Sequence, residues 1–169
     1  MSKIEIYKGD ICTLKVDAIV NAANTTLLGG GGVDGAIHRA AGPGLLEECR
    51  TLKGCPTGQA KITSAYNLPC KFVVHAVGPI WKGGNYGEEE LLASVYKNPI
   101  RIAGNIKLES IAFPNISTGI YGFPKDLAAR IAISAVTEGL KKAKTVNKVV
   151  FCVFDDENLK IYRKAIEKD

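Results

Sequence analysis

The chain has 169 residues, of which 46% are hydrophobic and 23% charged, and its net charge is +5. This length and composition predict one globular domain over residues 1–169, large enough to bury about 70% of its unfolded surface. No hydrophobic run approaches the roughly 20 residues of a membrane-spanning helix, and the N-terminal MSKIEIYKGD lacks the apolar centre of a signal peptide. We therefore expect a cytoplasmic protein without a membrane partner.

The charged and sulfur-containing residues narrow the choice of ligand. Five cysteines form an odd set without a CxxC pair, which predicts reduced thiols, and with only two histidines beside them a metal site is not expected. A net charge of +5 suits an anionic ligand. It is too small and too dispersed to indicate nucleic-acid binding, so nucleic acid is not expected as a partner.

Apolar strands alternate with amphipathic helices along the chain. Strands are expected over residues 4–8, 16–20, 60–66, 72–77, 110–113 and 149–154. Helices are expected over residues 34–41, 44–52, 88–103, 124–142 and 158–167, with Pro99 kinking or dividing the third of them. Several strands are apolar throughout, which is typical of a sheet covered on both faces. The prediction is an α/β fold of three layers.

A glycine-rich loop follows the second strand. Asn21 and Asn24 end the strand, four glycines follow at 29–32, and Asp34 opens a helix. Strand, glycine loop and helix start together let backbone N–H groups approach a phosphate closely. The spacing Gly30-x-Gly32-x-x-Gly35 formally fits a dinucleotide fingerprint, but the loop begins too far beyond its strand. The chain contains neither GK[ST] nor GxSxG, which excludes the P-loop NTPase and α/β-hydrolase motifs.

A second loop of the same kind lies at residues 117–122, where STGIYG stands between a buried strand and a helix that Pro124 opens. Successive backbone N–H groups and a helix N-terminus would suit a diphosphate. An ordinary strand-to-helix turn would not need two glycines so close together.

Taken together, these stretches resemble the macro domain family. The motifs are GDI at 9–11, VDAIVNAAN at 16–24, GGGGVDGAIHRAAG at 29–42 and FPNISTGIYGFP at 113–124. CPTGQA at 55–60, ITSAYNLP at 62–69 and HAVGPIW at 75–81 extend the resemblance over nearly the whole chain. It is nearest to the MacroD-type hydrolases of ADP-ribose and O-acetyl-ADP-ribose, and it implies a three-layer α-β-α fold around a mixed sheet. VYKNPIRIAG at 95–104 departs from the usual uninterrupted helix.

The resemblance implies roles for the residues of both loops. Asp10 would accept a hydrogen bond from the adenine amino group, helped by the backbone of Ile11, and Phe154 would lie against the adenine face. The residues alone favour a turn or cap carboxylate for Asp10, and for Phe154 the alternative is a side chain packed in the core. The resemblance also implies substrate-binding positions at Gly32, Val33, Ser117, Gly119, Ile120 and Tyr121.

Asn24 and Asp34 are the catalytic candidates. The resemblance implies that Asn24 holds the distal ribose and that Asp34 positions or activates water. From the residues alone, Asp34 is as well read as a helix N-cap, which would make it strongly acidic. Asn21 is expected to tie the loop to its own backbone.

The histidines and cysteines receive no catalytic role. His75 is predicted to be a hydrogen-bonded core residue within its apolar strand, and His38 to lie at the surface or behind the site. The cysteines are interpreted as small buried apolar residues.

Three functions remain open. The first is a hydrolase that acts on the distal ribose of O-acetyl-ADP-ribose or of ADP-ribose attached to acidic protein side chains, without a metal or a cofactor. The second is a non-catalytic reader of ADP-ribose or poly(ADP-ribose). The third, a regulator of RNA or poly(ADP-ribose), has no arginine-rich or aromatic stretch to support it. The pairing of Asn24 with Asp34 favours the enzyme, and a complete site in one chain favours a monomer.

Overall fold

The computed structural model describes residues 3–167, so the outermost residues of the predicted domain, 1–2 and 168–169, lie outside the described part. Six strands form one sheet in the order β1-β6-β5-β2-β4-β3. They span Lys3–Lys8 (β1), Ala18–Ala23 (β2), Ala60–Ser64 (β3), Phe72–Val77 (β4), Ser110–Phe113 (β5) and Lys148–Val153 (β6). All neighbouring strands run parallel except β3, which is antiparallel to β4. The predicted mixed sheet is confirmed.

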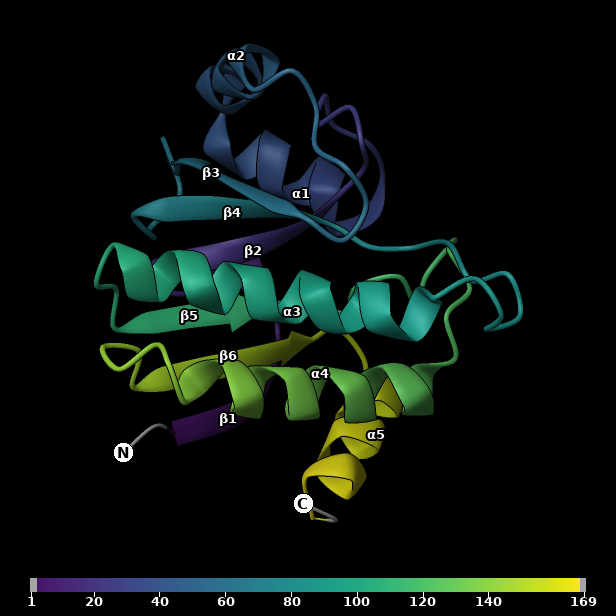
Figure 1. Cartoon of the computed structure of the whole chain (residues 1–169). Helices are drawn as coiled ribbons and strands as arrows, with labels where there is room; N and C mark the ends of the chain where they lie inside the picture. The colour runs from purple at the N-terminus through teal and green to yellow at the C-terminus, as the bar shows by residue number, and fades with distance from the viewer. Residues whose placement is uncertain (1–2, 168–169) are drawn as a thin grey trace.

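Helices cover both faces of the sheet, as Figure 1 shows. They span Gly32–Ala41 (α1), Pro43–Thr51 (α2), Glu88–Asn105 (α3), Lys125–Leu140 (α4) and Asp156–Glu167 (α5), and a 3₁₀ turn, η1, spans Ile11–Thr13. The helices α1 and α2 lie on one face, while α3, α4 and α5 lie on the other. The three-layer prediction is confirmed. Among the described residues, no helix is long and apolar enough to cross a bilayer.

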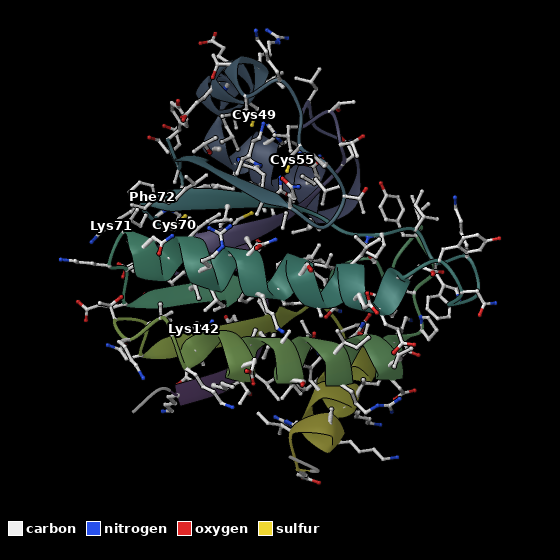
Figure 2. All side chains as sticks on the ribbon, in the orientation of Figure 1. Cys49, Cys55, Cys70, Lys71, Phe72 and Lys142 are labelled. Carbon is white, nitrogen blue, oxygen red and sulfur yellow. The ribbon has the colours of Figure 1, made fainter. Side chains whose placement is uncertain are left out.

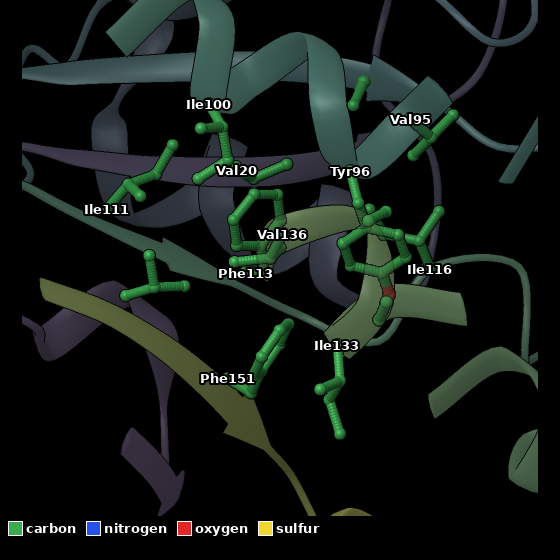
Figure 3. Packing of buried hydrophobic residues seen from close by; sticks show 14 of the residues in the cluster. Val20, Val95, Tyr96, Ile100, Ile111, Phe113, Ile116, Ile133, Val136 and Phe151 are labelled. Atoms are coloured by element: carbon green, nitrogen blue, oxygen red, sulfur yellow. The ribbon is translucent and has the colours of Figure 1, made fainter. Parts of the chain in front are cut away.

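Two hydrophobic cores result from the alternation of side chains along the strands. In β4, Val73 and Val77 pack under α1 and α2, whereas Val74 and Ala76 pack under α3 and α4. The second core is the larger, and Figure 3 shows its aromatic centre. There the ring centroids of Tyr96 and Phe113 lie 5.2 Å apart, and those of Phe113 and Phe151 lie 6.0 Å apart. Burial on both faces explains why these strands are apolar throughout.

The structure differs from the sequence prediction at the end of β2, at the start of α1 and at Pro99, in each case for an identifiable reason. The strand β2 continues through Asn21 to Ala23, because pairing with β4 extends to Val77. The helix α1 begins at Gly32, two residues before Asp34. Pro99 does not divide α3, whose apolar side is buried along its length against the sheet and α4. Packing holds this helix together across a position where one backbone hydrogen bond is missing.

Candidate functional site

The site lies where β2 and β5 separate at the carboxyl edge of the sheet. These strands share only two register pairs, Ala18 with Ile111 and Ile19 with Ala112. Beyond them, β2 leads into α1 on one face, while the chain after β5 leads through Pro114 into α4 on the other. Divergence of this kind opens a crevice at the carboxyl ends of the strands, the usual ligand position in open α/β sheets.

Two adjoining cavities form one groove there, with volumes of about 440 and 420 Å³. Gly32, Val33 and Gly119 line both cavities and therefore mark their junction. The structure brings every sequence-predicted site residue to this groove. The first cavity is lined by Asn24, Asp34, Ser117, Ile120 and Tyr121, and the second by Asp10, Ile11 and Phe154.

At the far end of the second cavity, Asp10 caps the turn η1. Its Oδ1 accepts a hydrogen bond from the backbone N–H of Cys12 at 2.9 Å. The cap interpretation of Asp10 is thus confirmed, and Asp10 also lines the second cavity. Phe154 is 83% exposed, so the interpretation of this ring as a core side chain is wrong. Because Phe154 follows the last residue of β6, its ring lies on the rim of the cavity.

The N-terminus of α1 faces the junction of the two cavities. Its N-cap is Gly31, which has no side chain to satisfy the first-turn N–H groups. Within residues 3–167, the backbone N–H groups of Gly32 and Val33 have no protein acceptor. Unpaired N–H groups at the positive end of a helix dipole attract an anion.

The loop at residues 117–122 provides the opposite wall. Ser117 has a left-handed backbone, with φ of 67°, and its buried Oγ has no partner among the described residues. Such a conformation costs about 1–3 kcal/mol in a non-glycine residue and is typical of ligand-binding loops. In the described part of the chain, the N–H groups of Gly119, Ile120 and Tyr121 also lack protein acceptors. Gly78 makes this loop possible, because a Cβ at Gly78 would collide with the Ser117 Oγ.

Asp34 lies at the bottom of the first cavity and is only 5% exposed. The prediction that it is an N-cap is wrong, because Asp34 sits inside the first turn of α1. Its Oδ1 accepts a hydrogen bond from Asn21 Nδ2 at 2.8 Å and lies 3.4 Å from His38 Nε2. The predicted strong acidity is wrong as well. Burial raises the pKa of Asp34, and the contacts with Asn21 and His38 offset this only in part.

The other oxygen of Asp34 faces the glycine loop. A Cβ at Gly30 would lie 3.1 Å from Asp34 Oδ2 and 3.4 Å from Asn24 Nδ2. Asp34 Oδ2 and Asn24 Nδ2 therefore lie on either side of the space beside Gly30, which the Cβ of any other residue would fill. Among residues 3–167, Oδ2 has no hydrogen-bond partner. A carboxylate with one oxygen anchored and the other open to a cleft can hold a water molecule or accept a proton.

Asn24 shapes the loop and keeps one donor for a ligand. Its Oδ1 accepts hydrogen bonds from the Thr26 and Leu27 backbones, and its Nδ2 donates to the Gly29 carbonyl at 2.9 Å. The other Nδ2 proton has no acceptor among the described residues. The backbone-tying role predicted for Asn21 thus belongs to Asn24. Asn21 lies within β2, where its side chain is directed to the α1 side of the sheet and reaches Asp34.

The burial predicted for His75 is confirmed, and four of the five cysteines are buried as predicted, whereas Cys12 is only partly buried. His75 is fully buried and hydrogen-bonded, and His38 lies behind Asp34 with 15% of its side chain exposed. All five cysteines are free thiols. Burial raises the pKa of Cys49 to about 11 and that of Cys12 to about 12, which leaves both thiols poorly nucleophilic.

Sequence reasoning missed two residues of the groove. Arg39 lines the second cavity and brings a positive charge to it, and Asn115 lines both cavities. A signal for Arg39 was present, because Val33, Ala36 and Arg39 follow one another at intervals of three and so share one helix face. Asn115 follows Pro114 directly beyond β5, where a side chain enters the crevice only because β2 and β5 separate.

Comparisons with known proteins agree with this geometry. A family model described as the macro domain matches residues 20–132. The chain is 61% identical to a macro domain-containing protein of Chlorobaculum tepidum over 96% of this chain and 95% of that protein. It is 54% identical to ADP-ribose glycohydrolase MACROD2 of Homo sapiens over 98% of this chain and 40% of that protein. A variant of the Oceanobacillus iheyensis macrodomain with ADPR superposes with a TM-score of 0.94 at 42% identity, over 99% of this chain and 93% of that one.

The fold and the groove define an α/β protein with a nucleotide-sized site at a topological switch point. This chain belongs to the macro domain family. The resemblance drawn from its sequence motifs is confirmed.

Proposed function

We propose that this protein is a hydrolase that binds ADP-ribose and cleaves the bond between its distal ribose and an attached group. The attached group would be an acetyl ester, as in O-acetyl-ADP-ribose, or an acidic protein side chain. Support comes from the similarity to a relative named ADP-ribose glycohydrolase and to a macrodomain bound to ADPR. The single observation that carries the proposal is the buried Asp34 carboxylate, with one oxygen anchored and one facing the cleft.

The groove suggests how the ligand would lie. Adenine fits the second cavity, with Asp10 at its amino group and the exposed ring of Phe154 against its face. The diphosphate would occupy the junction, where the start of α1 and the loop at 117–122 both offer free N–H groups. The distal ribose would then reach the first cavity, close to Asn24 and Asp34.

Hydrolysis would use a water molecule held by Asp34 Oδ2. Attack of this water on an acetyl carbonyl, or on the anomeric carbon of a protein-linked ribose, releases acetate or the protein carboxylate together with ADP-ribose. The remaining Nδ2 proton of Asn24 would orient the ribose. The raised pKa of Asp34 makes this carboxylate a better proton acceptor than an ordinary aspartate. A phosphate oxygen of the ligand could assist as a base. We propose a monomer, because one chain supplies the whole groove.

The first test is release of ADP-ribose from a protein that is mono-ADP-ribosylated on glutamate. Asp34→Asn keeps the size of the side chain and should abolish most turnover, while the Kd for ADP-ribose stays within about tenfold, roughly 1.4 kcal/mol. The matched control is Asp126→Asn, which removes an exposed carboxylate of α4 outside the groove.

Three outcomes separate the candidate functions. Release by the wild type and the control but not by Asp34→Asn supports the hydrolase. Turnover of O-acetyl-ADP-ribose alone would restrict the enzyme to the ester. Tight ADP-ribose binding with no turnover of either substrate would make the protein a reader and refute the proposal.

A further inference from the structure

Three polar side chains lie buried in the apolar layer between the sheet and the helices α1 and α2. Asn21 and His75 are fully buried and Thr63 is 2% exposed. Register places Asn21 directly opposite His75, and Thr63 opposite Val73, two residues before His75. All three side chains therefore share one face of neighbouring strands β2, β4 and β3. None of them lines the groove.

The hydrogen-bond partners of His75 assign its ring proton to one of the two nitrogens. Thr63 Oγ1 donates its one proton to the Ser64 carbonyl at 2.9 Å. His75 Nε2 lies 3.0 Å from the same oxygen, which can therefore only accept a hydrogen bond from the ring. His75 thus carries its proton on Nε2 and presents Nδ1 as an acceptor. The Asn21 amide nitrogen lies 3.2 Å from that Nδ1 and can donate to it.

The other proton of the Asn21 amide goes to Asp34. The same Nδ2 lies 2.8 Å from Asp34 Oδ1, while the Asn21 Oδ1 is buried without a partner among the described residues. If the Asn21 amide were flipped, its oxygen would face the Asp34 carboxylate. The oxygen therefore has no partner in the described part of the chain because the nitrogen must donate to both Asp34 Oδ1 and His75 Nδ1. The Asn21 carbonyl oxygen thus lacks a hydrogen bond to any described residue, and in return the Asn21 amide nitrogen binds both Asp34 and His75.

The surroundings of His75 keep its ring neutral. Burial, reinforced by nearby His38, lowers the pKa of His75 to about 4, so the ring is neutral near pH 7. The neighbouring polar groups are Asp34 and His38 of α1 and Cys49 of α2, whose Sγ lies 3.7 Å from His75 Nε2. Figure 2 shows Cys49 on the α2 side of the sheet. A thiol is a weak acceptor and does not replace the hydroxyl of Thr63.

We infer that Thr63, His75 and Asn21 form a positioning chain that sets the rotation of the Asp34 carboxylate and leaves Oδ2 facing the cleft. Thr63 selects the histidine tautomer, the tautomer selects the orientation of the Asn21 amide, and the amide holds Asp34 Oδ1. With the proton on Nδ1 instead, two donors would face each other and the amide would turn away from Asp34. This inference rests on the proposed function, because the group being positioned is its catalytic carboxylate.

The decisive variant is Thr63→Val, which keeps the shape of the side chain and removes its hydroxyl. Thr63→Ser retains the hydroxyl and should restore the wild-type behaviour. The matched control is Thr145→Val, because the Thr145 hydroxyl also donates to a carbonyl, that of Leu108, but lies outside the chain of hydrogen bonds. Each variant is assayed for kcat of ADP-ribose release, for the Kd of ADP-ribose and for Tm.

Thr63→Val is expected to lower kcat by about 10- to 100-fold, as displacement of a catalytic group does, and to leave Kd within about twofold. Thr63→Ser and Thr145→Val should keep the wild-type kcat. An unchanged kcat in Thr63→Val overturns the inference. Parallel losses of kcat, ADP-ribose binding and Tm would also overturn it, because they would show that Thr63 acts on packing alone.

A direct measurement needs no variant and no turnover. Nitrogen-15 NMR of the imidazole ring distinguishes the two tautomers, and the wild-type protein should show His75 protonated on Nε2. A proton on Nδ1 would overturn the inference even if Thr63→Val failed to fold. Absence of turnover in the wild type would instead refute the proposed function, while the tautomer signal would still report on the hydrogen bonds of His75.

Discussion

The contact between Gly35 and the glycine loop offers a quantitative test of how the site is built. Gly35 lies in α1, and a Cβ at this position would come within 2.6 Å of the Gly30 carbonyl oxygen. Ordinary contact begins at 3.4 Å, so in Gly35→Ala the loop or the helix must move by several tenths of an ångström. The atom in the way belongs to the backbone, which cannot turn aside as a side chain can.

The expected effect on stability is small and the effect on turnover large. Alanine gains about 1 kcal/mol over glycine in a helix, whereas overpacking costs about 1–3 kcal/mol, so the net loss is about 0–2 kcal/mol. For a chain of this size that corresponds to a fall in Tm of up to about 8 °C. Gly30 lies against both Asp34 Oδ2 and Asn24, so its displacement should lower kcat by about 10- to 100-fold.

The assay is single-turnover release of ADP-ribose at a temperature where every variant is folded, with Tm measured in parallel. Gly139→Ala is the control, because it places a methyl group inside α4, 3.2 Å from the Ile100 side chain and away from the groove. Gly139→Ala should keep the wild-type rate. A rate for Gly35→Ala within about twofold of the wild type, in a variant with unchanged Kd, would refute the reasoning that the loop must lie at this distance from α1.

Three further predictions concern carboxylates. Burial raises the pKa of Asp34, so the charged carboxylate lowers the stability of the folded protein at neutral pH. Asp34→Asn should therefore raise Tm at pH 7. Thermal melts at a series of pH values should show this gain disappearing below the ordinary pKa of 3.8. Burial acts to raise the pKa of Glu88, but the N–H groups of Lys82, Gly84 and Tyr86 outweigh it and bring the pKa to about 2. Glu88→Gln should therefore lower Tm at pH 7, with the difference fading as pH falls from 4.5 through 2. Asp10→Ala should weaken ADP-ribose about 10- to 100-fold by calorimetry, while ribose 5-phosphate, which has no adenine, keeps its affinity.

The sequence by itself determined the layers and the two loops. Strands apolar on both faces require helices on both faces, and local chemistry places a glycine run before α1 and a second glycine loop before α4. Parallel strands bring such loops to one edge of the sheet, so the groove could be anticipated from strand ends and motifs. Every predicted site residue lines it for that reason.

Tertiary structure decided the chemical state of the site. Asp34 looked like a strongly acidic N-cap because a cap is a local property, whereas its burial depends on how closely α1 packs over β2. The loop-tying role predicted for Asn21 falls to Asn24 for the same reason. Both follow an apolar run, but pairing of β2 with β4 extends past Asn21 and directs its amide into the core, while Asn24 lies beyond the last pair and binds its own loop. Burial and partners depend on contacts between distant segments, which no local pattern encodes.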